Sequence, residues 1–560
     1  MEVTVAGTVS KKGFFPVNNW RVALVATATL ISIPVLVIVA SLLQPYSPAW
    51  RHLAETVLGD YVTNSALLML GVGTGTLILG VTAAWLTAMC EFPGRRFFSW
   101  ALLLPMAIPA YIIAYTYTGL LDFGGPVQEA LRETFDWRYG DYYFPQIRSL
   151  GGAICMLSLV LYPYVYLLVR IAFLEQSTAV LEASRSLGKT PWQTFFQVAL
   201  PMARPAIVAG LSLALMETLA DYGTVEYFGV SAFTTGIFRT WYGLGELNTA
   251  AQLAAVLLLF VFVLIVLERW SRRRMRFHHQ SIQREPSRIH LTGSKAVLAF
   301  AVALSIFSLG FLIPAGQLSV WALGSWQGGS EHFLALVVNS FGLAAIASLA
   351  CLLLALLVGY GKRLHPGPIE ESAARISSMG YAVPGTVIAV GVLIPFAWLD
   401  NSIDSLARSW FNVSTGLLLS GTLFALVFAY VVRFLSVSLQ SVESGLAKIR
   451  PSIDESARSL GRSPIGVLRD IHLPMLRGSL LTALLLVFVD VLKELPTTLI
   501  LRPFNFNTLA VRTYELASDE RLAEAALPAL AIVAIGLLPV ILLTRSMSRE
   551  TPTAERSANA

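Results

Sequence analysis

Two pairs of acidic residues lie inside long apolar segments of this 560-residue chain. Glu217 and Asp221 are four residues apart, and Asp490 and Glu494 repeat the pair 273 residues later. Residues four apart lie on the same face of an α-helix. Because a charge at the centre of a bilayer costs about 2.5–3.5 kcal/mol on insertion scales, such carboxylates usually face a bundle interior or water. Four carboxylates of this kind predict a path that favours cations.

Two structural roles would explain the same carboxylates without a path. They could form ion pairs with the basic residues Lys493, Arg239 and Arg512. The helices could also end early, so that the carboxylates would be solvated. The sequence leaves the path and these structural roles open as alternatives.

Other residue combinations do not complete a catalytic, metal or nucleotide site. The segment Gly188-Lys189-Thr190 resembles the end of a phosphate-binding loop, but Ala183 occupies the position where that loop needs its first glycine. The three cysteines are scattered, without the spacing of a metal site or of a disulfide framework. We therefore expect a chain that is not an enzyme, binds no cofactor or metal of its own, and depends on a partner for energy.

A longer repeat precedes each acidic pair. Residues 181–206 and residues 454–479 align without a gap. So many identities predict that the chain contains the same structural unit twice. The identical positions are Glu182/Glu455, Arg185/Arg458, Ser186/Ser459, Leu187/Leu460, Gly188/Gly461, Pro191/Pro464, Pro201/Pro474, Met202/Met475 and Arg204/Arg477.

Each copy predicts a short helical hairpin. One helix ends at Gly188 or Gly461, since glycine can adopt the left-handed conformation that closes a helix. A second helix begins directly afterwards, with Thr190 or Ser463 as its N-cap and a proline as its first residue. In the first copy, Gln193 completes a capping box with Thr190.

The second helix of each hairpin carries apolar side chains that suit docking into a partner groove. Packing against the chain's own spans is the alternative. A Leu-Pro pair, at Pro201 and at Pro474, is expected to end this short helix. The apolar candidates are Phe195, Phe196 and Val198 in the first hairpin, and Ile465, Val467, Leu468 and Ile471 in the second.

The composition is that of a polytopic membrane protein. Hydrophobic residues make up 55% of the chain and charged residues 13%, whereas soluble domains contain about 25% charged residues. The net charge of +6 is therefore assigned to loops on the cytoplasmic side rather than to nucleic-acid binding. Apolar segments of about 20 residues span a bilayer. Twelve are predicted, at 21–43, 63–89, 97–121, 150–173, 204–221, 247–268, 295–317, 337–360, 376–399, 416–440, 478–500 and 525–544.

The basic residues predict the orientation of these spans. Most of the 40 Lys and Arg residues fall on one side, which holds both hairpins and both termini, and the positive-inside rule makes this side cytoplasmic. The repeat extends beyond the hairpins and predicts two homologous parallel halves. The expected domains are an N-terminus with the first span (1–59), a first repeat (60–269), a basic linker with the seventh span (270–334), a second repeat (335–545) and a tail (546–560).

Both hairpins resemble the EAA loop of bacterial ABC importer permeases, whose pattern is E-A-A-x(3)-G followed by L-P. The first copy reads Glu-Ala-Ser from Glu182 and the second reads Glu-Ser-Ala from Glu455, so each departs at one position. In addition, residues 220–243 and 493–530 resemble the ferric-iron permeases, in which both halves are fused into one chain. The resemblance implies an all-α type I ABC importer permease with about twelve transmembrane helices.

This resemblance also implies the partners and the docking residues. In the family, the second helix of each hairpin docks onto an ATPase subunit. The chain would thus lie in the bacterial inner membrane, bind two copies of an ATPase that uses the ATP, and receive ferric iron from a periplasmic iron-binding protein. The positions carried over to the docking loops are Glu182, Ala183, Gly188, Phe195 and Pro201 in the first hairpin, and Glu455, Gly461, Leu468 and Pro474 in the second.

Alternatives remain for the cargo and for the class of transporter. The same machinery could carry thiamine, a polyamine or a phosphonate. A secondary transporter would explain twelve spans in parallel halves, but not the paired hairpins. Within the hairpins, Glu182 and Glu455 could bridge to the ATPase or brace the hairpin itself.

Overall fold

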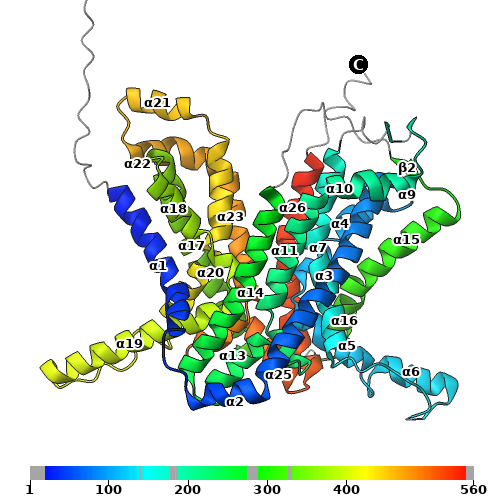
Figure 1. Cartoon of the computed structure of the whole chain (residues 1–560), viewed down its shortest axis with the longest axis horizontal. Helices are drawn as coiled ribbons and strands as arrows, with labels where there is room; N and C mark the ends of the chain where they lie inside the picture. The colour runs from blue at the N-terminus through cyan, green and yellow to red at the C-terminus, as the bar shows by residue number, and fades with distance from the viewer. Residues whose placement is uncertain are drawn as a thin grey trace, which may run out of the picture.

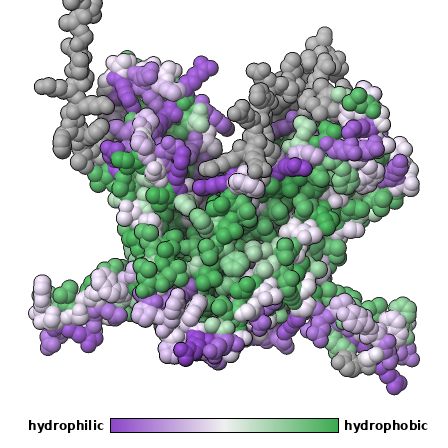
Figure 2. Space-filling view, viewed as in Figure 1, coloured by the Kyte–Doolittle hydropathy of each residue, from purple (hydrophilic) through white to green (hydrophobic). Residues whose placement is uncertain are grey.

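The computed structural model describes residues 19–138, 140–176, 183–184, 186–273, 288–325 and 331–549. This part of the chain is helical almost throughout (Figure 1). Ten of its helices are long and apolar enough to cross a membrane, and two further helix pairs, each bent at a short break, raise the number to as many as 12. Figure 2 shows a hydrophobic middle and hydrophilic ends. The predicted all-α polytopic fold is confirmed.

The elements of the first half follow one another from α1 to α14. Their bounds are α1 (Asn19–Ser41), α2 (Pro48–Thr56), α3 (Leu58–Met89), β1 (Cys90–Glu91), α4 (Arg95–Ala101), η1 (Leu104–Ala107), α5 (Ala110–Leu121), α6 (Pro126–Phe135), α7 (Leu150–Glu175), α9 (Pro191–Thr194), η2 (Phe195–Ala199), α10 (Leu200–Met202), α11 (Arg204–Ala220), α12 (Gly223–Tyr227), α13 (Phe233–Tyr242) and α14 (Leu247–Arg273).

The second half repeats this order with different lengths. Its elements are β2 (Ile289–His290), α15 (Ser294–Phe307), η3 (Ser308–Leu312), α16 (Ile313–Gly324), α17 (Glu331–Leu364), α18 (Pro368–Ser377), η4 (Gly380–Ala382), α19 (Gly385–Phe411), α20 (Leu423–Ala447), α21 (Pro451–Ser459), α22 (Pro464–Val467), η5 (Leu468–His472), α23 (Leu473–Lys493), α24 (Pro496–Leu501), α25 (Leu509–Ser518) and α26 (Leu522–Arg549).

The two halves exchange their outer helices. Helix α1 packs against α17, α18 and α19 of the second half, whereas α15 and α16 pack against α3, α4 and α5 of the first half. The last helix of each half crosses in the same way, because α14 contacts α19, and α26 contacts η1 and α5. A two-residue parallel pairing of β1 with β2 adds a further link. Each half is therefore enclosed partly by helices of the other.

The two hairpins lie at the same end of the bundle, which we call the hairpin face. In Figure 1, α9 and α22 mark this end, and α2, α13 and α25 lie at the opposite end, the far face. The acidic pairs lie near the ends of α11 and α23, the helices that follow the hairpins. Each acidic pair is thus connected to its hairpin through one span.

Three predicted spans differ from the helices that the structure contains. Residues 97–121 do not form one helix, because α4 and η1 end before Pro109 and the chain bends by 94° into α5. The predicted span 376–399 is replaced by α18, η4 and α19, and α19 begins after Pro384 and continues to Phe411. The predicted span 478–500 ends at Lys493, before the separate helix α24. Proline lacks the N–H that a continuous helix needs and disfavours helical geometry in the preceding residue.

Glycines allow α3 and α7 to approach closely. A Cβ atom on Gly71 would overlap the side chain of Ile154, and one on Gly75 would overlap Ser158. Small residues at such positions let membrane helices pack through van der Waals contact. Gly73, on another side of α3, lies within ordinary contact distance of α11 instead.

We expect Gly75→Val to destabilise the fold, because the new side chain must displace Ser158 on α7. Overpacking of this kind costs about 1–3 kcal/mol. Thermal unfolding of the purified protein in detergent measures the loss. Gly342→Val on α17 is the matched control, since a Cβ there meets nothing within 4 Å. Equal melting temperatures for both variants would contradict the assignment of this contact.

Candidate functional site

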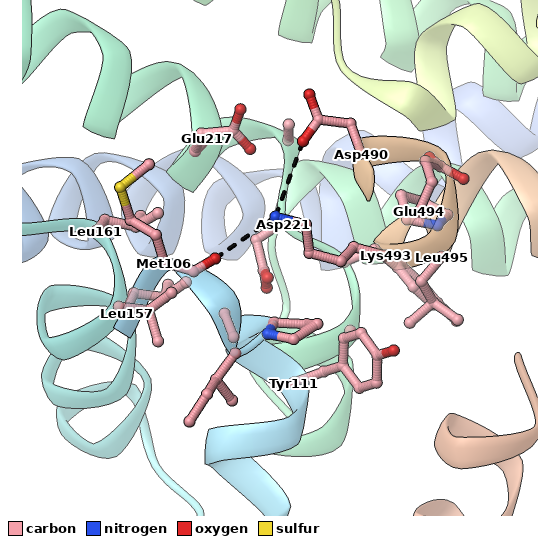
Figure 3. A pocket seen from close by; sticks show the side chains of 18 of the residues that line it. Met106, Tyr111, Leu157, Leu161, Glu217, Asp221, Asp490, Lys493, Glu494 and Leu495 are labelled. Atoms are coloured by element: carbon pink, nitrogen blue, oxygen red, sulfur yellow. Dashed lines mark hydrogen bonds and ion pairs between the residues drawn. The ribbon is translucent and has the colours of Figure 1, made fainter. Parts of the chain in front are cut away.

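A cavity of about 160 Å³ lies between the two halves. All four predicted acidic residues line it, and Figure 3 shows them converging from α11 and α23. The structure thus brings together carboxylates that are 273 residues apart in sequence. The other lining residues are Met106, Ile108, Pro109, Ala110, Tyr111, Leu157, Val160, Leu161, Tyr164, Ala220, Tyr222, Gly223, Tyr381, Arg433, Phe434, Lys493, Leu495 and Pro496.

Interrupted helices surround this cavity. The chain leaves helical geometry between η1 and α5, at η4 before α19, between α11 and α12, and between α23 and α24. Within a membrane, irregular backbone is tolerated where it is buried in protein or lines a water-filled cavity, because its polar groups need partners. Transporters form binding sites from discontinuous helices for the same reason. The cavity therefore lies where a polar cargo could cross.

Asp221 is the first of the two residues between α11 and α12. One carboxylate oxygen accepts hydrogen bonds from the N–H groups of Thr224 (3.1 Å) and Val225 (3.2 Å), and the other accepts from the Thr224 hydroxyl (3.0 Å). These bonds satisfy the free N–H groups at the start of α12. Asp221 thus holds the break between two helices while it lines the cavity.

Glu494 has the equivalent position between α23 and α24. Its carboxylate accepts hydrogen bonds from the N–H groups of Thr497 (3.0 Å) and Thr498 (3.1 Å), and from both threonine hydroxyls. Arg433 on α20 adds a buried ion pair at 3.0 Å. A Cβ on Gly385 would collide with this pair, so a larger residue at the start of α19 would have to displace it.

The structural alternatives left open by the sequence are partly realised for Asp221 and Glu494. The helices do end next to these residues, but the carboxylates cap the following helix instead of being solvated. Of the three suggested cationic partners, Arg239 pairs with Glu226 at 2.9 Å and Arg512 pairs with Glu515 at 3.6 Å, both away from the cavity.

Glu217 and Asp490 lie one helical turn closer to the hairpin face. Asp490 is 3.8 Å from the Lys493 ammonium group, which also donates to the Met106 carbonyl of the other half at 3.5 Å (Figure 3). Glu217 interacts with the hydroxyl of Tyr381, which belongs to the second half. Glu217 therefore has a partner in the other half, and Asp490 has a partner on its own helix that also reaches the other half.

The two halves do not contribute equal charge. Helices α7 and α20 begin 273 residues apart, and so do the ends of α11 and α23. At this offset Arg433 corresponds to Val160, and Lys493 corresponds to Ala220. The two carboxylates of the second half are thus accompanied by two cations, whereas the first half contributes Glu217 and Asp221 without a lining cation. The negative excess lies on the first half.

The arrangement suits passage of a cation more than tight retention. Among the residues that the structure describes, no group of three or more His, Cys, Asp and Glu side chains could hold a metal ion. Conduction requires a site that attracts an ion and still releases it. Separated carboxylates, two of them near cations, meet this requirement better than a closed ligand cage.

Sequence reasoning missed Arg433, Tyr164 and Tyr381 as part of this site. Arg433 had a detectable signal, since an arginine within the apolar segment 416–440 is costly unless it faces a partner or water. The tyrosines had no comparable signal, because aromatic residues are common throughout apolar segments. Their position depends on how α7 and η4 meet in the folded chain.

The described parts of both hairpins have the predicted backbone. Gly188 and Gly461 adopt left-handed conformations, with φ of +77° and +76°. The capping box of the first hairpin has both bonds, from the Gln193 N–H to the Thr190 hydroxyl (3.3 Å) and from the Thr190 N–H to the Gln193 side chain (2.9 Å). Ser463 caps the second hairpin helix. Glu182 lies outside the described residues.

The expected helix end at the Leu-Pro pair holds to within one residue in the first hairpin and is wrong in the second. Pro201 lies inside α10, and the chain bends by 69° only after Met202. Pro474 lies in the first turn of α23, which continues from η5. A π-helical turn precedes each proline and shifts the hydrogen-bond register. In the second hairpin this shift accommodates Pro474, and the helix continues to Lys493.

The first hairpin exposes aromatic side chains. Trp192 is 72% exposed and Phe196 is 56% exposed, and their rings are stacked at 5.8 Å. Phe195 instead turns inward and packs against Trp85 at 4.7 Å. Ala183 is exposed at the preceding helix. Trp192 was missed as a docking candidate, although its place directly after the capping proline was visible in the sequence.

The second hairpin exposes aliphatic side chains in place of aromatic ones. Ile465 is 64% exposed, and Leu468 is half-buried. Val467 is only 2% exposed, so packing within the chain, the alternative to docking, holds for this residue. Pro474 is exposed.

Asp454 anchors the second hairpin to the bundle. It accepts from Arg363 at 2.7 Å and contacts the His472 ring at 2.6 Å. Burial alone would raise the pKa of Asp454, but the hydrogen bonds from Arg363 and His472 outweigh it and hold the pKa below its usual value. The neighbouring Glu455 is exposed and makes no hydrogen bond or ion pair with the rest of the described chain. Bracing therefore falls to Asp454 and not to Glu455.

Comparison with known proteins identifies the family. A model of the binding-protein-dependent transport system inner membrane component matches the chain twice, at residues 76–277 and 351–550. The chain belongs to this family. It is a multi-pass permease component of the inner membrane with two homologous halves.

Individual relatives of the permease include both fused and single-domain proteins. The permease is 27% identical to the Fe(3+)-transport system permease protein FbpB 2 of Haemophilus influenzae, over 87% of this chain and 90% of that protein. It is 24% identical to the putative ferric transport system permease protein FbpB 1 of the same organism, over 78% and 70%. One half is 29% identical to the sulfate transport system permease protein CysT of Escherichia coli, over 35% of this chain and 72% of that protein.

We expect Arg433→Met to destabilise the permease, because it leaves Glu494 buried without its cationic partner. Removing one partner of a buried pair costs about 3–5 kcal/mol. Thermal unfolding in detergent measures the effect. Val160→Met at the equivalent position of the first half is the matched control. The double variant Arg433→Met, Glu494→Gln should recover part of the loss, and a double variant as unstable as the single one would show that the pair is not responsible.

Proposed function

We propose that the permease is the membrane subunit of an ATP-driven importer of ferric iron, which a periplasmic binding protein delivers. The observation that carries this proposal is the cavity between the halves, where four carboxylates outnumber two cations. The relatives with ferric transport names match the permease over most of its length. Ferric iron is a hard cation that prefers oxygen ligands, and carboxylates supply them.

The charge of the cavity distinguishes this cargo from an anion. A transporter of sulfate needs donors or positive charge along its path, whereas here the excess is negative and lies on the first half. The sulfate transport relative matches only one half. Thiamine and polyamines are also cationic and would also suit carboxylates. The cavity therefore favours a cation as cargo, and the relatives favour iron among the cations.

The two hairpins would each receive one copy of an ATPase, which binds and hydrolyses the ATP. The exposed rings of Trp192 and Phe196 and the exposed side chain of Ile465 offer the apolar contacts that helix-in-groove docking uses. The hairpin face, together with both termini, is then cytoplasmic, and the far face receives the binding protein. Phe195, which packs on Trp85, and the half-buried Leu468 would hold the hairpins on the bundle, while Gly188 and Gly461 set the backbone turns.

A movement of the hairpins on ATPase docking can be transmitted to the cavity along single helices. In the second half η5 continues into α23, so the hairpin and Asp490 belong to one nearly continuous span. The 18 residues from His472 to Asp490 extend about 27 Å at 1.5 Å per residue. In the first half a 69° bend separates the hairpin from α11 and Glu217. The second half therefore has the stiffer connection between ATPase docking and the carboxylates.

Uptake should depend on the carboxylates that line the path. We expect Glu217→Gln with Asp490→Asn to lower uptake of radiolabelled ferric iron by roughly tenfold, equivalent to about 1.4 kcal/mol. The measurement uses proteoliposomes that contain the ATPase and the binding protein. Glu129→Gln with Glu133→Gln removes the same charge from exposed positions of α6, outside the cavity and to the side of the bundle, and should leave uptake unchanged. Unchanged uptake in the first double variant, with the ATPase still bound, would assign these carboxylates a structural role only.

The hairpin glycines provide a separate test of ATPase docking. Gly188→Val with Gly461→Val forces β-branched residues into positive φ, which costs about 1–2 kcal/mol per position. A Cβ meets nothing within 4 Å at either site, so the effect arises from the backbone alone. Co-purification of the ATPase should fall. Gly188→Asn with Gly461→Asn is the matched control, since Asn tolerates this conformation. Full binding by the valine variant would exclude these hairpins as the docking elements.

A further inference from the structure

Two segments extend sideways from the bundle at the far face. The first arm is residues 123–138 and 140–149, which include α6, and the second arm is residues 398–422, which include the outer half of α19. In Figure 1 they extend in opposite directions, away from the hairpins. They occupy equivalent positions in the two halves, because the first follows the helix that begins after Pro109 and the second begins within the helix that starts after Pro384. Their sequences differ, so the likeness lies in their placement.

In the second arm, the loop that follows α19 folds back and covers one face of that helix. Asp400, which is 1% exposed, accepts hydrogen bonds from the N–H groups of Leu418, Leu419 and Ser420 at 3.1, 2.9 and 2.8 Å. One turn further on, Asp404 accepts from the Thr415 N–H at 2.8 Å and pairs with Arg408 at 2.6 Å. These bonds fold the returning loop onto the polar face of α19. The polar groups of the arm are thus satisfied internally.

The opposite face of this helix is apolar and exposed. Leu399, Ile403, Leu406 and Trp410 lie at intervals of four, three and four residues, which places them on one stripe. Leu406 is 54% exposed and Trp410 is 76% exposed. Neighbouring apolar side chains that are also exposed are Trp398, Phe411, Val413, Leu417 and Leu418. A patch of this extent on a surface facing water would be unusual.

The first arm also has one polar side and one apolar side, but its apolar side contains fewer residues. Its polar side is tied together by Tyr142, which donates to Gln128 at 2.7 Å, and by Arg132, which lies 4.3 Å above the Phe123 ring. Val127 and Phe135 are exposed on α6. Phe135 stacks with Trp137 at 4.7 Å. Aromatic residues of this kind concentrate where a protein meets the membrane–water interface.

We propose that both arms lie flat in the interface of the membrane leaflet at the far face, with the stripe of Leu399, Ile403, Leu406 and Trp410 in the acyl boundary. The arms leave the bundle at the edge of its hydrophobic belt and extend sideways, and hydrophilic residues gather on the side away from that belt (Figure 2). An amphipathic helix in this position inserts its apolar face among the lipids and keeps its polar face in water. This inference holds for any cargo.

A lipid surface explains the orientation of the stripe better than a protein partner does. A binding protein approaches along the bundle axis, from the water beyond the far face, where the arms present their hydrophilic residues. The two arms lie on opposite sides of the bundle, so lipid contact on both sides would also limit its tilt in the membrane. The stripe is thus a lateral anchor and not a docking site.

Spin labels on the two faces of α19 test this inference. Leu406→Cys places a label on the stripe, and Asn401→Cys places one on the opposite, exposed face. Both variants are made with Cys155→Ser, because Cys155 is the exposed native thiol among the three cysteines and Cys90 and Cys351 are buried. The permease is reconstituted in nanodiscs of phosphatidylethanolamine and phosphatidylglycerol. Collision rates are measured with oxygen, which enters lipid, and with a water-soluble nickel chelate.

The label at position 406 should collide with oxygen several-fold more, relative to the nickel chelate, than the label at position 401. Ile403→Cys gives a second position on the stripe, and Val127→Cys against Glu129→Cys repeats the comparison in the first arm. Equal accessibility of both faces to the nickel chelate would overturn the proposal. So would a stripe that is open to water in nanodiscs and becomes protected only when the binding protein is added, since the stripe would then belong to that partner.

Discussion

A backbone that leaves helical geometry inside an apolar medium must find partners for its own polar groups. In this permease that constraint is met at the breaks after α11 and α23, where Asp221 and Glu494 accept the free N–H groups of the next helix. Both capping residues are acidic and line the cavity. The carboxylates that satisfy the backbone therefore also contribute to the charge of the candidate path.

Fusion of two homologous halves in one chain allows each half to change on its own. The second half carries Arg433 and Lys493 where the first half carries Val160 and Ala220. A complex of two identical subunits would place the same residues on both sides, and this asymmetry would be absent. The hairpins differ in a similar way, since Phe195 attaches the first through aromatic packing on Trp85 and Asp454 attaches the second through hydrogen bonds with Arg363 and His472.

The exchange of outer helices couples the movement of the two unequal halves. Because α1 packs on the second half and α16 on the first, neither half can move without helices that belong to the other. The cavity lies at the boundary between the two halves, where such movement would act on its lining residues. The Lys493 contact with the Met106 carbonyl crosses that boundary, as does the contact of Tyr381 with Glu217. A change at one hairpin can thus reach charged groups contributed by both halves.

The sequence by itself determined features that depend on neighbouring residues. Glycine at 188 and 461 specified a positive φ, Thr190 and Gln193 specified a capping box, and apolar length located the ten long spanning helices of the described chain. Such features are local, because a few consecutive residues supply both the constraint and its solution. The i, i+4 spacing of the acidic pairs likewise showed that each pair would share a helical region, although it left their partners open.

Only the tertiary structure decided which distant groups meet. No local pattern assigns Arg433 to Glu494 or turns the stripe of α19 outward. These outcomes depend on the packing of α20 on α23, of α1 on α19, and of each half against the other. A buried charge is stable only beside its partner, and the position of that partner is a property of the assembled bundle and not of the residues around either charge.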